Sequence, residues 1–229
     1  MYDNMALMPH LSLKKTIQHS LEANDLNAVA VLARENRKAL SLLVRLAYAK
    51  DTLMGQRAIR AMGLVAQELV KTEPEILRDR VRKLLWSLND ESGGIGWSAP
   101  ELLGEIVSAD PDRFADVIPL IADVYGIEEK VFRPGVLYAL GRIAESAPAR
   151  IVPFLAVIEQ GLTDDDPEVR ARALQAAGRI KAHLDQKSQE RLEQGMKGLL
   201  ADEAEVWIYG EKDFKGREIR EVAQEELDR

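Results

Sequence analysis

The chain has 229 residues, of which 46% are hydrophobic, 30% are charged and only 5% are aromatic, and its formal net charge is −7. Because it contains no cysteine, disulfide bonds, thiolate metal sites and cysteine nucleophiles are excluded, and a reducing compartment fits. No apolar run reaches the roughly 18 residues that span a bilayer, and the N-terminus lacks the pattern of a signal peptide. We therefore expect a soluble, cytoplasmic protein that does not contact a membrane.

The charge is unevenly distributed along the sequence. Residues 1–90 hold 14 basic and 10 acidic side chains, residues 91–168 hold 5 and 15, and residues 169–229 hold 12 and 13. A nucleic-acid sheath needs a continuous basic track that neutralises phosphates. The acidic middle interrupts any such track, so the sequence disfavours nucleic acid as a partner.

In chain order, the first half shows helical spacing of apolar residues. Residues 1–24 are predicted to form an N-terminal cap with a helix over 11–23, and further helices are predicted over 25–36, 38–49, 53–71 and 73–88. Each carries one apolar stripe and a polar remainder, as expected of helices that pack on neighbours through one face.

The second half continues this pattern and then departs from it at the end. Helices are predicted over 111–125, around Gly141, within the stretch from Asp164 to Leu184 and over 186–200. Residues 206–209 alternate like a strand and a turn-like segment follows, so a small hairpin is one interpretation of the C-terminal region. A diverged last repeat with a final polar helix over 218–227 is the other.

Glycines inside four of the predicted helices recur at a nearly constant interval. They are Gly63, Gly104, Gly141 and Gly178, separated by 41, 37 and 37 residues. The positions four before, one before and two after each glycine are almost all apolar. A glycine disfavours an isolated helix, so a recurrent one requires a packing reason. A period near forty residues is typical of two-helix units stacked into a solenoid.

The segment after Asp164 carries the clearest copy of the pattern, in the form DxxPxVRxxALxAxGxI. In this pattern the chain resembles the HEAT-repeat family, including the group with PBS-lyase HEAT-like repeats. The resemblance covers most of the chain and implies an all-α fold, an α-solenoid of about five two-helix repeats, within one domain over 1–229. The repeats are expected over 25–200, and residues 201–229 are expected to form a diverged C-terminal repeat or cap.

The positions three before and one after each repeat glycine are expected to face away from the buried stripe at 100° per residue. In HEAT-family solenoids the second helices line the concave side, so the resemblance implies that these positions line a groove. The groove would be polar and of mixed sign, which suits a protein or peptide partner. The candidate binding residues are Arg60, Glu101, Tyr138, Gln175, Glu105, Arg142 and Arg179.

The repeat spacing is stretched at residues 86–101, where three glycines stand between two tryptophans. Trp86, Asp90, Glu91 and Trp97 join Glu101 as candidate partner-binding residues there, because a long loop on a rigid scaffold often carries function. The alternative is a wide turn whose two tryptophan rings pack on neighbouring repeats. The loop lacks the GxxxxGK motif of a phosphate cradle.

No catalytic or metal-ligating constellation is evident. The three histidines have no adjacent glutamate, unlike the iron-binding His-Glu pairs of the HEAT-like deoxyhypusine hydroxylases, so we expect no metal and no cofactor. The HEAT-like alkylpurine DNA glycosylases remain an alternative, because Trp86 and Asp90 are four residues apart and could share a helix face. The sequence favours a non-enzymatic HEAT-repeat scaffold and leaves its oligomeric state open.

Overall fold

The computed structural model describes residues 12–88, 97–127, 130–209 and 214–229. Within these ranges the chain is predominantly α-helical, with one small sheet near the C-terminus. The elements are α1 (Leu13–Glu22), α2 (Leu26–Glu35), α3 (Lys38–Ala47), α4 (Leu53–Thr72), α5 (Pro74–Ser87), α6 (Ala99–Ala109), α7 (Val117–Asp123), α8 (Arg133–Ala144), α9 (Pro148–Ile151), α10 (Leu155–Gly161), α11 (Pro167–Ile180), α12 (Gln186–Lys197), β1 (Glu205–Tyr209), β2 (Phe214–Glu218) and α13 (Ile219–Asp228).

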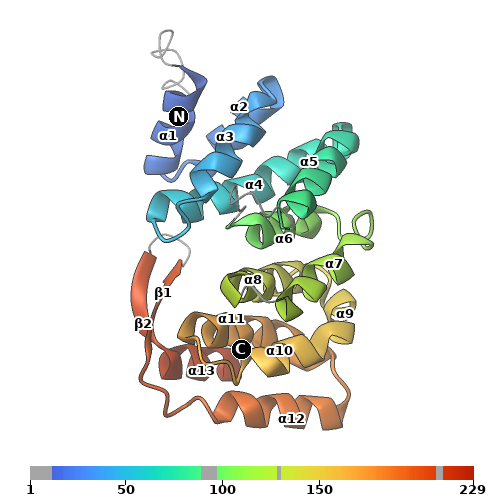
Figure 1. The fold of residues 1–229 in the computed structure, drawn as a ribbon, viewed down its shortest axis with the longest axis vertical. Coiled ribbons are helices and arrows are strands. Elements are labelled where there is room, and N and C mark those ends of the chain that lie inside the picture. The colour runs from blue at the N-terminus through green and yellow to red at the C-terminus, as the bar shows by residue number, and fades with distance from the viewer. Residues whose placement is uncertain (1–11, 89–96, 128–129, 210–213) are drawn as a thin grey trace.

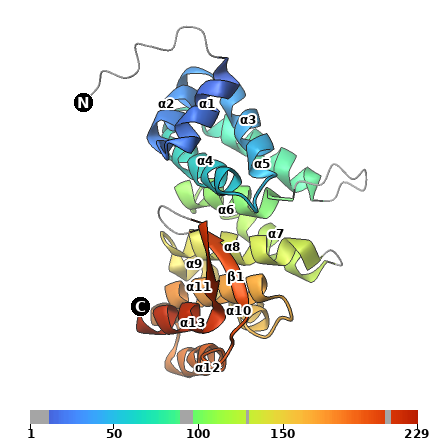
Figure 2. The ribbon, with the colours of Figure 1, turned by 90° about the vertical axis from the view of Figure 1, so that its left-hand side faces the viewer.

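The helices form two layers that stack along the long axis of the molecule (Figures 1 and 2). In the inner layer α2, α4, α6, α8, α11 and α13 each pack against the next. In the outer layer α3, α5, α7, α10 and α12 pack on inner-layer helices. The prediction of an all-α solenoid is therefore confirmed.

Helix α11 shows how the sequence produces one such inner helix. The Asp166 side chain caps its N-terminus by accepting a hydrogen bond from the Glu168 N–H at 2.8 Å, and Pro167 occupies the first helical position. Leu174, Ala177 and Ile180 are fully buried. The predicted apolar stripe therefore faces the core, where neighbouring inner helices meet it.

Three of the four repeat glycines are required by close packing between inner helices. A Cβ on Gly104 would lie 2.5 Å from the Ala139 Cα of α8, which is too close for any side chain. A Cβ on Gly63 would overlap the Glu105 carboxylate, and one on Gly178 would overlap the Glu226 carboxylate. At Gly141 the nearest atom would be 3.5 Å away, an ordinary contact.

The helix predicted over 111–125 is shorter in the structure, where α7 begins at Val117 and residues 111–116 form turns. In an α-helix starting at 111, the N–H of residue 119 would donate a hydrogen bond to the carbonyl of Ala115. Pro119 explains the difference, because proline has no N–H to make this bond. Starting at Val117 places Pro119 in the first turn, where that N–H is unused. Pro153 acts similarly between α9 and α10, where a short 3-10 turn interrupts the α-helix.

The predicted hairpin is present as an antiparallel pair, with Glu205 opposite Glu218 and Tyr209 opposite Phe214. It is inserted between α12 and α13, and it runs along one side of the stack toward the N-terminal helices (Figure 1). Val206 and Ile208 are buried, whereas Trp207 on the opposite face is exposed. At the far end the Tyr209 hydroxyl lies 3.5 Å from Asn24 Oδ1 in the turn between α1 and α2, so the hairpin joins the two ends of the solenoid.

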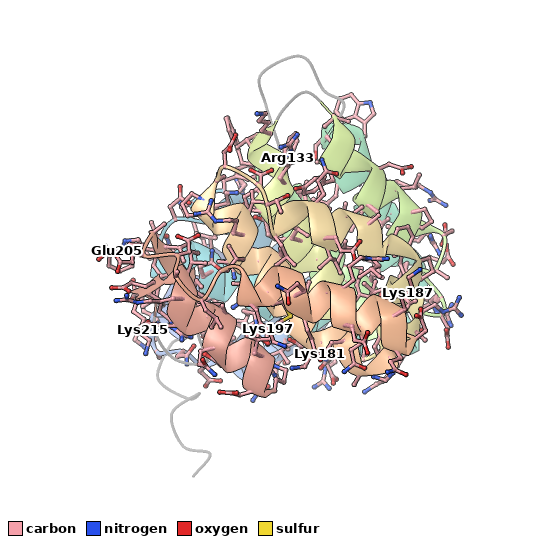
Figure 3. All side chains as sticks on the ribbon, turned by 90° about the horizontal axis from the view of Figure 1, so that it is seen from below. Arg133, Lys181, Lys187, Lys197, Glu205 and Lys215 are labelled. Carbon is pink, nitrogen blue, oxygen red and sulfur yellow. The ribbon has the colours of Figure 1, made fainter. Side chains whose placement is uncertain are left out.

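The C-terminal end of the stack carries charged side chains, as Figure 3 shows for Lys187 and Lys197. Lys181 Nζ donates hydrogen bonds to the carbonyls of Glu226 at 2.9 Å and Leu227 at 2.6 Å. These carbonyls belong to the last turn of α13, which lacks internal partners for them. A polar outer surface and a capped last helix are what a terminal repeat needs in water.

Candidate functional site

Glu105 is fully buried, which corrects the expectation that it faces away from the core. Its Oε1 accepts hydrogen bonds from Arg60 Nη1 at 3.0 Å, Tyr138 Oη at 2.5 Å and Arg142 Nε at 2.9 Å. Its Oε2 accepts a further bond from Arg142 Nη2 at 3.2 Å. Arg142 therefore binds both carboxylate oxygens at once, through two N–H groups of its planar guanidinium.

The absence of a side chain on Gly63 makes room for this carboxylate between α4 and α6. The negative charge of Glu105 affects its neighbours: although burial opposes charge on Arg60, the carboxylate raises the pKa of that guanidinium. Burial and the same carboxylate raise the pKa of the Tyr138 phenol, so this hydroxyl stays a proton donor. Glu105 is thus neutralised inside the protein and offers no charge to the groove.

Glu101 is also buried, so its expected position on an open face is wrong as well. Its Oε1 lies 3.4 Å from Lys50 Nζ, whereas its buried Oε2 has no hydrogen-bond partner. That oxygen lies against Gly135 in the first turn of α8, where the positive end of the helix stabilises a negative charge. Burial opposes charge on Lys50, but Glu101 outweighs it and raises the Lys50 pKa.

A cavity of about 670 Å³ lies along the inner layer, next to the Glu105 cluster. It is bordered by Leu26 at the start of α2, by residues of α4, α8, α11 and α13, and by Tyr209 of β1. Because α2 and α13 belong to opposite ends of the solenoid yet border one cavity, the inner layer is the concave side. We call this space the concave cavity.

The structure brings five of the predicted binding residues together at the concave cavity. They are Arg60 of α4, Tyr138 and Arg142 of α8, and Gln175 and Arg179 of α11. All five occupy the positions three before or one after a repeat glycine. The helical projection therefore placed them correctly, although it failed for the two glutamates of α6.

Several residues around the cavity were missed from the sequence. Arg172 precedes Gln175 by three residues and lies on the same face of α11, so helical periodicity alone could have found it. Glu145 follows Arg142 by three residues in the same way. Tyr209, Glu226 and Arg229 reach the cavity because the hairpin and α13 fold back onto the inner layer, and no local pattern signals that.

Alternating charges run along the concave cavity from α8 to the C-terminus. Arg142 forms an ion pair with Glu145, whose Oε1 lies 2.9 Å from Arg179 Nη2. Further along, Arg229 Nε donates to Glu226 Oε2 at 2.7 Å. The pair of Arg179 with Glu145 ties α11 to the end of α8, whereas the pair of Arg229 with Glu226 lies at the end of α13.

Arg172 and Arg179 are the two arginines of α11 that border the concave cavity. The Arg172 guanidinium stacks over the Tyr138 ring at 5.3 Å and donates to Gln175 Oε1 at 3.1 Å. Burial lowers the pKa of Arg179 to about 10; Arg229 and Arg142 act in the same direction, and Glu226 opposes them. Positive charge therefore accumulates on this part of the wall.

Trp86 and Trp97, predicted at the two ends of the 86–101 loop, do not border the concave cavity. Trp86 lies in the last turn of α5 in the outer layer with 70% of its surface exposed, and Trp97 is 44% exposed. The wide-turn interpretation required both rings to pack between repeats, and neither ring is buried there. Asp90 and Glu91, and with Asp90 the aromatic-carboxylate pair expected of a glycosylase, lie outside the described residues.

None of the helices in the part of the chain that the structure describes is both long and apolar enough to cross a membrane. Over residues 12–88, 97–127, 130–209 and 214–229, no three side chains of the types His, Asp and Glu are grouped so that they could hold a metal ion.

Neither a family model nor a curated protein sequence matches the chain. Solved structures do match. An engineered protein superposes with a TM-score of 0.57 at 19% identity, covering 96% of this chain and 98% of its own. A designed armadillo repeat protein in complex with the peptide (KR)4 gives 0.55 at 16% identity, with 94% and 97% covered. Computationally designed armadillo repeat proteins for modular peptide recognition give 0.53 at 18%, with 95% and 99% covered.

These likenesses extend over nearly the whole chain and include both helical layers. The protein has a HEAT/armadillo-like repeat fold. At these identities the likeness concerns the fold alone. In this HEAT/armadillo-like chain a hairpin stands between α12 and α13 and reaches the turn between α1 and α2.

Proposed function

We propose that the protein is a non-enzymatic repeat scaffold that binds a protein or peptide partner on its concave face. The observation that carries the proposal is the concave cavity, which is lined by residues of the inner helices α2, α4, α8, α11 and α13 and bounded by the hairpin. Its volume of about 670 Å³ lies in the range of sites that enclose most of a small ligand. A short segment of a partner fits such a space, whereas a folded domain does not.

The carboxylates beside the cavity support a binding role over a catalytic one. Glu105, Glu145 and Glu226 are each paired with arginine side chains. Such pairing occupies the lone pairs of each carboxylate with hydrogen-bond donors of the protein, which leaves them poorly placed to exchange a proton with a substrate. The arrangement holds inner helices in place around a binding space.

The solved structures give the proposal a precedent and a contrast. Among them is a designed armadillo protein in complex with the basic peptide (KR)4. In the present chain the wall carries five arginines, so a basic peptide is not the expected partner. The exposed rings of Trp86 and Trp97 are proposed as a second contact for the same partner outside the cavity.

Site-specific photo-crosslinking tests this proposal. A photoreactive phenylalanine replaces Gln175 inside the concave cavity, and in a matched variant it replaces Gln194 on the exposed face of α12. We expect one defined partner adduct from the Gln175 position in native lysate and none from the Gln194 position. The identified partner, once purified, is then expected to bind the wild-type chain with defined stoichiometry in calorimetry.

Equal adducts from both positions, or no binding by the purified partner, would contradict a concave binding face. The Trp86→Ala variant tests the second contact separately. A loss of partner affinity with an unchanged melting temperature is expected, because the exposed ring stabilises little within the chain itself.

A further inference from the structure

The side chains that border the concave cavity differ in charge from the chain as a whole. The formal net charge of the chain is −7, whereas five arginines and three glutamates among the described residues border the cavity. Two of these arginines share the buried carboxylate of Glu105, and the other three are Arg172, Arg179 and Arg229. A partner entering the cavity therefore meets the guanidinium groups of these three arginines.

The arginines around Gln175 retain hydrogen-bonding capacity. A guanidinium carries five N–H donors. Arg172 donates one hydrogen bond, from Nη1 to Gln175 Oε1, and its Nη2 lies 3.7 Å from Glu168 Oε1. Arg229 directs Nε and Nη2 to Glu226. Each guanidinium has more N–H groups than these contacts use, and both side chains border the concave cavity.

The Glu105 cluster shows which chemistry this wall recognises. There Arg142 binds one carboxylate through Nε and Nη2, with help from Arg60 and Tyr138. Planar, two-point binding of a carboxylate is the geometry for which arginine is suited. Arg172 presents the same group one helix further along, on the cavity side.

We propose that the concave cavity binds an acidic segment of the partner, whose carboxylate side chains are held by Arg172, Arg179 and Arg229. This inference rests on the proposed function and names the chemistry of its ligand. The segment enters between α11 and the hairpin, where Tyr209 borders the cavity. Its carboxylates accept hydrogen bonds from these guanidinium groups and neutralise their positive charge.

Titration calorimetry with three probes tests the inference on the full chain. The probes are a peptide of about eight alternating Asp and Glu residues, the basic peptide (KR)4, and inorganic phosphate. We expect the acidic peptide to bind wild type, to weaken with added salt because screening reduces the attraction, and to bind far tighter than the basic peptide. Inorganic phosphate alone is expected to bind weakly, as it offers one anionic group to a wall with several cations.

Two variants and a control locate the binding. Arg172→Gln and Arg229→Gln should each weaken the acidic peptide about tenfold, as expected of arginines that anchor a ligand. The Arg229 side chain is 46% exposed but binds the buried Glu226, so the melting curve of each variant is compared with that of wild type to show that it is folded. Arg191→Gln is the matched control, because Arg191 pairs with Glu159 on the outer layer at 2.6 Å, and it should not change affinity.

The inference is overturned if (KR)4 binds as tightly as the acidic peptide, or if both cavity variants bind it as wild type does. It is also overturned if neither peptide binds, or if inorganic phosphate binds tighter than the acidic peptide, since a small free anion would then be the ligand. The proposed function is judged independently, by the adduct at Gln175, so the two failures are distinguishable.

Discussion

The two halves of the inner layer use equivalent repeat positions in opposite ways. On α6 these positions carry Glu101 and Glu105, which are buried between helices and neutralised by Lys50, Arg60 and Arg142. On α8 and α11 they carry Tyr138, Arg142, Gln175 and Arg179, which border the concave cavity. One half buries its charged residues between helices, and the other places them at the border of the concave cavity.

Glycines next to α6 account for much of this difference. Gly63 and Gly135 leave space for the Glu105 and Glu101 carboxylates between helices, so these side chains turn inward. At Gly141 the neighbouring Ala176 occupies the corresponding space, and the long side chains of α11 turn toward the cavity. A small residue on one helix therefore decides whether a charged residue on the next one is structural or available for binding.

The largest predicted effect concerns the half that buries its charged residues. Glu105→Gln removes the charge shared by Arg60 and Arg142, so that Arg60 loses its counter-ion and Arg142 keeps Glu145 alone. We expect the free energy of unfolding to fall by about 3–5 kcal/mol, measured by urea denaturation. Glu145→Gln, at a side chain 39% exposed, is the control and should cost less than about 1 kcal/mol. Equal losses would erase the distinction between the two halves.

Two repeat glycines that look alike in the sequence should respond in opposite directions to alanine. Gly104→Ala places a Cβ 2.5 Å from the Ala139 Cα, and such overpacking against backbone costs about 1–3 kcal/mol. Gly141→Ala finds 3.5 Å of room and should gain about 0.5–1 kcal/mol from the better helix propensity of alanine. Melting temperatures of the two variants provide the comparison, and a shift of the same sign in both would contradict it.

A smaller loss is expected for Glu101 than for Glu105, although both are buried. Glu101 has one polar contact, with Lys50 at 3.4 Å, and its Oε2 has no hydrogen-bond partner. Glu101→Gln should therefore lower the free energy of unfolding by about 1 kcal/mol, a typical net value for one such interaction. If urea denaturation gives a loss as large as that of Glu105→Gln, the N-terminal end of α8 stabilises the Glu101 carboxylate far more than the single contact with Lys50 indicates.

The smallest predicted effect tests how the hairpin joins the ends of the solenoid. Tyr209→Phe removes the hydroxyl that lies 3.5 Å from Asn24 Oδ1. A contact this long should contribute less than about 0.5 kcal/mol to global stability, so the melting temperature should hardly change. Hydrogen exchange in the turn between α1 and α2 should nevertheless become faster. Unchanged exchange there would show that buried Val206 and Ile208 alone hold the hairpin.

The sequence predicted the solenoid well because each repeat satisfies a local rule. The spacing of Leu174, Ala177 and Ile180 identifies a helix face, and the recurrence of Gly178 identifies the stack. The same local rule failed for Glu101 and Glu105, because their burial depends on Gly135 and Gly63 from neighbouring helices. It also failed to find Tyr209 and Arg229 at the cavity, since only the tertiary path of the hairpin and α13 brings them there.

Hydrogen–deuterium exchange of the full chain, with and without its purified crosslinked partner, tests the central claim most directly. If the concave cavity is the binding site, the partner should slow exchange in α8, α11 and the hairpin and leave α7, α10 and α12 of the outer layer unchanged. Protection confined to those three outer helices, with α8, α11 and the hairpin unaffected, would contradict the account.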